Sequence, residues 1–256
     1  MNLSGLKLID LSVPLAPSVS EAVPVSIDYM AHECGGAHLA ELVGIEQADL
    51  QDGLGWASER ISAITHSSTH VDAPFHYSPQ CNGRPSRTVD EIPLDWFWGP
   101  GVCIPVDAYP QHEPVTAEEL TAFEEKHDRR IVSGDIVLFR TGAERHYGSA
   151  SYNEHGRGLS PSLVEALCDK GVRLFGTDAW SIDPPFRLMR ERLGTVGPGS
   201  VWEAHFAGRK VEFCAIEKLS NLDKLPPVGF WVACFPVKVL RGSAAWARAV
   251  AFLNGV

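Results

Sequence analysis

A strand, a helix and a second strand follow one another in the middle of the sequence, and this succession constrains the fold more than any other feature. Residues 135–140 (DIVLFR) form a continuous apolar run, which is typical of a strand buried on both faces. Ser160 as N-cap and Pro161 in the first turn predict the start of a helix, and Gly171 predicts its end. Residues 172–177 (VRLFGT) predict the next strand. The succession predicts an α/β fold.

Other segments carry weaker patterns. Alternation with a period of two predicts strands in two of them, residues 7–15 and 59–65. Two apolar stretches near the end of the chain are further candidates, residues 230–240 and 244–252. A capping box of Thr116 and Glu119 predicts a helix that runs to about Lys126. Residues 16–58 carry no pattern that assigns them, and we expect one domain over residues 1–256.

Composition excludes several classes of partner. A net charge of −10 argues against binding to nucleic acid, which requires clustered Lys and Arg. No apolar run approaches the roughly 20 residues that span a bilayer, and residues 1–15 do not resemble a signal peptide. The six cysteines are widely spaced, which is typical of reduced thiols. We therefore expect a cytoplasmic protein with no membrane and no nucleic-acid partner.

The densest chemistry lies in residues 66–76, which read HSSTHVDAPFH. His66, His70, Asp72 and His76 place three imidazoles and one carboxylate within eleven residues. The β-branched residues and the proline between them favour a loop or bulged strand over a helix, so that side chains two apart project to one side. Imidazole and carboxylate together are donors that zinc or manganese prefers, and a three-ligand set leaves positions open for water and substrate.

Two simpler interpretations compete with a catalytic metal. The histidines could be surface groups or hydrogen-bonded core groups, although their density argues against this. A structural metal usually has four protein ligands and favours thiolate, and Cys81 is the nearest cysteine.

The segment resembles the motif of the cyclase-like metal-dependent hydrolases, His-x-Gly-Thr-His-x-Asp-x-Pro-x-His. Every motif position matches except Ser68, which stands where the family has glycine. The resemblance implies a swivelling β/β/α fold, with a mixed β-sheet core and flanking helices. It also implies that His66, His70 and Asp72 hold a divalent metal ion and that His76 acts as a catalytic acid or base.

The resemblance extends to the C-terminal half of the chain. His205 lies in a Trp-Glu-Ala-His stretch, and Glu217 lies in Ile-Glu-Lys-Leu-Ser-Asn-Leu. In the kynurenine formamidase branch such a pair helps to bind a second metal ion, and in the isatin hydrolase branch a single manganese ion is implied. The resemblance therefore gives both residues a catalytic role or a share in a second metal site. The segments 176–181, 183–186 and 234–238 resemble the isatin hydrolase branch more closely.

The resemblance implies hydrolysis of a cyclic amide by a metal-activated water, with isatin opened to isatinate. Manganese is favoured as the ion and zinc is the alternative. A small aromatic substrate needs apolar walls, for which the candidates are Phe75, Trp180 and Trp56. The alternatives are an arylformamidase acting on N-formylkynurenine, a lactone or dienelactone hydrolase, and a metal-binding protein without turnover. The family likeness also implies a homodimer or a higher homo-oligomer.

Overall fold

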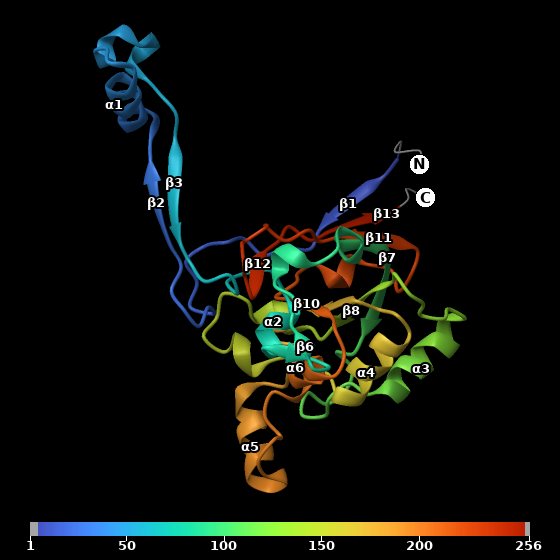
Figure 1. The fold of residues 1–256 in the computed structure, drawn as a ribbon. Coiled ribbons are helices and arrows are strands. Elements are labelled where there is room, and N and C mark those ends of the chain that lie inside the picture. Colours follow the sequence, from blue (N-terminus) through green and yellow to red (C-terminus); the bar gives the residue numbers. More distant parts are fainter. Residues whose placement is uncertain (1–4, 254–256) are drawn as a thin grey trace.

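A nine-stranded mixed sheet forms the centre of the computed structural model, which describes residues 5–253 (Figure 1). The order across the sheet is β1 (Lys7–Asp10), β13 (Val250–Leu253), β11 (Phe230–Ala233), β7 (Trp98–Pro105), β8 (Ile136–Arg140), β9 (Leu174–Thr177), β10 (Cys214–Glu217), β4 (His70–Asp72) and β12 (Ala244–Trp246). The four strands from β7 to β10 are parallel, and the pairs on either side of them are antiparallel. The expected α/β fold with a mixed sheet and flanking helices is confirmed.

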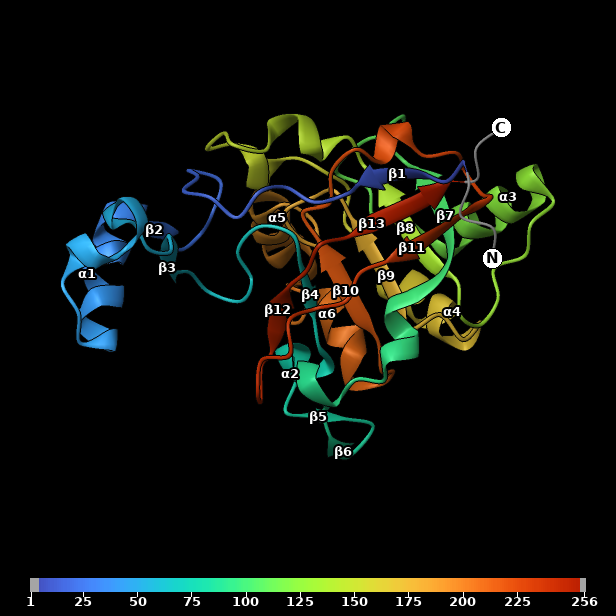
Figure 2. The ribbon, with the colours of Figure 1, turned by 90° about the horizontal axis from the view of Figure 1, so that it is seen from above.

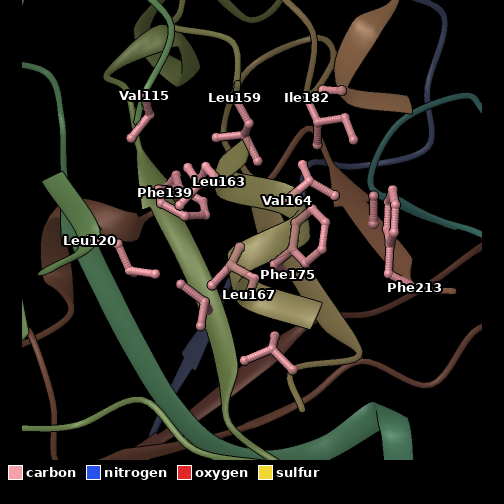
Figure 3. Close-up of a cluster of buried hydrophobic side chains, with 14 of the residues drawn as sticks. Val115, Leu120, Phe139, Leu159, Leu163, Val164, Leu167, Phe175, Ile182 and Phe213 are labelled. Atoms are coloured by element: carbon pink, nitrogen blue, oxygen red, sulfur yellow. The ribbon is translucent and has the colours of Figure 1, made fainter. Parts of the chain in front are cut away.

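One face of the sheet is covered by two helices, α3 (Ala117–His127) and α4 (Pro161–Asp169). Figure 3 shows Phe139 and Phe175 of the sheet against Leu163, Val164 and Leu167 of α4. Both helix starts have the caps that the sequence predicts. The Thr116 side chain accepts a hydrogen bond from the Glu119 amide, and the Ser160 side chain accepts one from Leu163.

The opposite face of the central strands is buried by a second cluster of apolar side chains. Successive residues of β8 alternate between the two cores: Val137 packs in the cluster under the helices, and Ile136 and Leu138 pack in the second cluster. That second cluster includes residues of β1, β11 and β13, such as Ile9 and Val232. Burial on both faces explains why β8 is apolar throughout, as the sequence indicated.

The first strand is shorter than the predicted segment 7–15, because β1 ends at Asp10. Beyond it, the Val13 amide donates a hydrogen bond to Thr69 Oγ1 over 2.9 Å, and the Ser68 hydroxyl donates one to the Pro14 carbonyl. The chain therefore leaves the sheet to cross the histidine-rich segment.

Residues 26–62 form an arm that extends away from the sheet in both views (Figures 1 and 2). Its strands are β2 (Ser26–Met30) and β3 (Ser58–Ser62), which pair antiparallel, and its helix is α1 (His32–Val43). The predicted strand at 59–65 therefore exists, but it lies in the arm and outside the main sheet. Large apolar side chains are exposed on the arm, and Tyr29 and Leu42 are each 75% accessible.

The remaining elements are short or peripheral. They are α2 (Pro74–Tyr77), β5 (Gln80–Cys81), β6 (Arg84–Pro85), α5 (Phe186–Val196) and α6 (Glu203–Phe206). All six cysteines are free thiols, and five of them are buried. Within residues 5–253, no helix combines the length and the apolar character that crossing a bilayer requires.

Leu163 tests the packing of α4 against the sheet. It is fully buried, so Leu163→Ala should lower the free energy of unfolding by about 3 kcal/mol through lost burial and a residual cavity. Leu193→Ala, on exposed α5 at 45% accessibility, is the matched control and should cost under about 1 kcal/mol. Urea denaturation measures both, and equal losses would contradict the core assignment.

Candidate metal centre

The strand β4 positions the two central residues of the motif. It lies between β10 and β12, with His70 opposite Glu217 and Asp72 opposite Ala215. Because side chains two apart on a strand project to the same side, His70 and Asp72 point into one site. The predicted loop or bulged strand is therefore confirmed for His70–Asp72, whereas His76 lies on a short helix, α2, that Pro74 begins.

The other two motif histidines flank this strand. His66 precedes it across a turn, and its Nδ1 lies 2.8 Å from Asp72 Oδ1. His76 follows it on α2, which Pro74 begins, and its Nε2 lies 4.0 Å from Asp72 Oδ2. The rings of His66 and His76 lie with their centroids 4.1 Å apart. The turn between His66 and β4 contains Ser68 at φ 55°, a left-handed conformation that favours the glycine of the family motif.

The C-terminal pair lies against the same carboxylate. His205, on α6, places Nε2 3.5 Å from Asp72 Oδ2 and 3.4 Å from Glu217 Oε1. Glu217, the last residue of β10, places Oε2 3.6 Å from His70 Nε2. Five residues from two distant parts of the sequence therefore meet around Asp72.

Outer hydrogen bonds fix the orientation of the buried imidazoles. His70 Nδ1 lies 2.8 Å from the Ser68 carbonyl, an acceptor, so Nδ1 carries a proton and Nε2 is the ring nitrogen that faces Asp72. His205 Nδ1 is hydrogen-bonded to the Asp183 carboxylate. Partners of this kind are typical of histidines that bind metals. Asp183 was not assigned from the sequence, although it lies in the segment 183–186 that carried part of the family likeness.

Four atoms that could bind a metal ion are buried without a hydrogen-bond partner among residues 5–253. They are His70 Nε2, His205 Nε2 and both carboxylate oxygens of Asp72. Unpartnered polar atoms are rare in protein interiors, and here they face one another. Donor atoms within 4.8 Å of one another form two sets that share Asp72, namely His66, Asp72, His76 and His70, Asp72, Glu217. These residues suit a divalent cation, because they combine imidazole nitrogen with carboxylate oxygen. Of the three metal ligands that the motif implies, His66 belongs to the first set, His70 to the second and Asp72 to both.

Burial and charge shift the titration of these groups. Burial lowers the pKa of His76 to about 4, although Asp72 acts in the opposite direction, so this ring is unprotonated at neutral pH. Burial also opposes charge on His205, but its hydrogen bond to Asp183 and the nearby Asp72 raise its pKa to about 10. For His70, Asp72 outweighs burial and raises the pKa. For Asp72, the neighbouring imidazoles outweigh burial and hold the pKa well below its usual value.

A cavity of about 280 Å³ opens onto the cluster. Its aromatic walls are Trp180, Phe186 and Trp202, and the Trp202 ring stacks on His205 with centroids 4.4 Å apart. Of the three aromatic residues expected at the substrate, only Trp180 lines this cavity. Phe75 is exposed outside the lining and Trp56 belongs to the arm, because sequence proximity to the motif does not determine where a side chain points.

Comparison with known proteins places this geometry in a family. The Cyclase family model matches residues 9–184, more than half of the chain. A kynurenine formamidase of Salinibacter ruber is 32% identical over 190 residues, which is 73% of this chain and 75% of that protein. The chain belongs to the Cyclase family.

A further relative of this Cyclase chain is an isatin hydrolase, and a solved isatin hydrolase shares its fold. That of Roseibium aggregatum is 27% identical over 206 residues, covering 73% of this chain and 72% of its own length. The crystal structure of an isatin hydrolase bound to the product analogue thioisatinate has the same fold, with a TM-score of 0.76 at 22% identity, over 98% of this chain and 93% of that one. The Cyclase chain is a hydrolase related to both kinds of enzyme, and the formamidase relative has the higher identity.

The raised pKa values of His70 and His205 predict how metal binding depends on pH. Below its pKa each ring holds a proton that must leave before Nε2 can bind an ion, so affinity should rise with pH. Because the pKa of His205 is about 10, the proton that this ring loses should make the dissociation constant for Zn²⁺ increase about tenfold per unit of pH lowered between about pH 8 and pH 6. Competition against a chromophoric chelator of known pH dependence measures it, and a flat profile would contradict the assignment.

Proposed function

We propose that the protein is a metal-dependent hydrolase that opens the amide ring of a small aromatic substrate, with the conversion of isatin to isatinate as the leading reaction. The observation that carries this proposal is the buried Asp72, whose unpartnered oxygens face imidazoles at the base of a cavity with aromatic walls. The donor set contains imidazole and carboxylate without thiolate, which suits both manganese and zinc, and the likeness to isatin hydrolases favours manganese with zinc as the alternative.

A divalent ion held by His66, His70 and Asp72 would supply a nucleophilic water at neutral pH and polarise the substrate carbonyl. Glu217 and His205 lie within reach of the same carboxylate and are the residues for a second ion. Tyr77, beneath the cluster, lies 3.3 Å from the Asp72 backbone carbonyl and donates a hydrogen bond to it, which helps to fix the strand.

His76 is the residue that we assign to proton transfer. With a pKa of about 4 its ring is unprotonated at neutral pH, which is the state that can accept a proton. The positive charge that then develops on the ring lies 4.0 Å from the Asp72 carboxylate, which stabilises it. The protonated ring can return the proton to the departing amide nitrogen.

The charge of the cavity supports a neutral aromatic substrate. Among the described residues of its lining, Lys218 is the only Lys or Arg, and its ammonium group is 2.6 Å from the Glu21 carboxylate. No unpaired cation therefore faces the cavity to bind the carboxylate of an amino-acid substrate. The flat rings of Trp180 and Trp202 suit a planar bicyclic ring.

An arylformamidase acting on N-formylkynurenine is the second candidate, because the formamidase relative of Salinibacter ruber has the higher identity. Both reactions use the same donor cluster and the same proton acceptor. They are separated by incubating the metal-loaded protein with isatin and with N-formylkynurenine and following absorbance and products. Ring opening of isatin that disappears on chelation and returns with one added ion supports the leading reaction. Cleavage of N-formylkynurenine alone supports the second.

Removal of the proton acceptor tests the mechanism. His76→Ala should lower kcat by about 10²- to 10⁴-fold, since general acid–base catalysis contributes this much, and should leave bound metal in place. His70→Ala should instead lose the metal. His112→Ala, an exposed histidine, is the control and should change neither quantity. Turnover of His76→Ala within threefold of the wild type would contradict its role.

The arm supports the proposal of a homodimer or higher oligomer. An isolated two-stranded hairpin is at best marginally stable, and apolar side chains such as Tyr29, Leu42 and Val43 are exposed on this one. A second copy of the chain would cover them.

Light scattering tests this assembly. The wild type should have at least twice the 27.9 kDa mass of one chain, and Tyr29→Arg with Leu42→Arg should shift it toward that mass, because buried unpaired charges oppose association. Val196→Arg, at an exposed apolar position on α5, is the control and should leave the mass unchanged. A monomeric wild type would exclude the proposed assembly.

A further inference from the structure

A buried ion pair lies in the wall of the cavity, beside the metal-facing cluster. Lys218 Nζ is 2.6 Å from Glu21 Oε2, and the two side chains are only 3% and 2% exposed. The residues are 197 positions apart in the chain. Buried ion pairs give little net stability, because the cost of removing both charges from water offsets their attraction. A buried pair at this position therefore points to a role in positioning the residues around it.

The pair connects three segments of the site. Glu21 Oε1 accepts a hydrogen bond of 2.9 Å from the Ser68 amide, and Lys218 Nζ donates one of 2.9 Å to the His66 carbonyl. Thr69 reinforces the junction, because its hydroxyl donates to the Lys218 carbonyl over 2.6 Å. The segment containing Glu21, the motif turn and the end of β10 are thereby held together.

Two of the connected residues have backbone conformations that must be held in place. Ser68 and Lys218 have φ values of 55° and 58°, in the left-handed region that disfavours residues with a Cβ atom. Both lie directly beside the site: Ser68 supplies the carbonyl that accepts from His70 Nδ1, and Lys218 follows Glu217 in the chain. The Glu21 carboxylate accepts a hydrogen bond from the backbone amide of Ser68 and pairs with the side-chain ammonium group of Lys218.

We infer that Glu21 and Lys218 are positioning residues, whose ion pair fixes the turn from His66 to His70 so that both imidazoles meet Asp72. The inference rests on the proposed metal centre. Neither residue is assigned a contact with substrate. The role requires the carboxylate specifically, because its two oxygens serve the Ser68 amide and the ammonium group at once. A glutamine has one acceptor oxygen and would leave one of these donors unpartnered.

The test uses Glu21→Gln, Lys218→Met and the double variant in the metal-free 256-residue chain. Competition against a chromophoric chelator gives the affinity for Zn²⁺, and circular dichroism gives the melting temperature. Loss of partners that orient metal ligands typically weakens metal binding 10- to 100-fold, so each variant should bind Zn²⁺ at least about tenfold more weakly. The double variant leaves no unpaired buried charge, so it should melt close to the wild-type temperature while its affinity stays low. It therefore remains informative if a single variant does not fold.

Glu165→Gln is the matched control, because Glu165 pairs with Lys210 over a similar 2.8 Å on the surface. Its affinity for Zn²⁺ should equal that of the wild type. Once a substrate is found that the wild type turns over, the metal-saturated Glu21 and Lys218 variants should show a decrease in kcat that is larger than the increase in KM. Wild-type affinity in the folded double variant would overturn the positioning role. A wild type that binds no Zn²⁺ and no Mn²⁺ would instead contradict the proposed function.

Discussion

The carboxylate of Asp72 is the group on which the site depends. It is fully buried, and four histidine rings and Glu217 lie around it. A lone carboxylate in such a place would be protonated or would destabilise the fold. The surrounding imidazoles keep its pKa low, and two of them are themselves oriented by the Ser68 carbonyl and by Asp183. The arrangement is consistent with a shell of donors organised around a positive charge.

The sheet explains how this shell is assembled. The parallel strands β7 to β10 bring the end of β10, with Glu217, to the carboxyl edge of the sheet, where ligands bind in many α/β proteins. The short strand β4 pairs with β10 in antiparallel register, so that His70 lies opposite Glu217. Helix α6 and the turn before α5 then add His205 and Asp183 to the same edge. Rigid strands therefore carry the central residues, and turns carry the residues that surround them.

Local signals predicted a large part of this molecule. Strand β8, the capped helices α3 and α4, and the strand character of the motif follow from short-range patterns, because burial on two faces and helix capping are recorded within a few residues. Apart from the strand β3, the arm could not be predicted, since residues 16–58 bury few side chains of their own and carry no clear period. Strand β7 was missed because glycine and proline interrupt its apolar pattern.

Contacts in the site between residues distant in the chain were harder to predict from the sequence. The pairing of Glu21 with Lys218 depends on a fold that brings together residues 197 positions apart. The lowered pKa of His76 comes from burial, which the motif does not encode. The cavity walls include Phe186 and Trp202 in place of Phe75 and Trp56, because strand and turn geometry, and not distance from the motif, decides which rings face the site.

The most direct test of the central claim is the position of the ion itself. Crystals grown with Mn²⁺ or Zn²⁺ would be measured on both sides of the absorption edge of the metal, so that an anomalous difference map locates the ion. We expect a peak within coordination distance of an Asp72 carboxylate oxygen and of His66 and His70, at the base of the cavity. A fully occupied peak elsewhere, with Asp72 and its neighbouring histidines left without an ion, would contradict it.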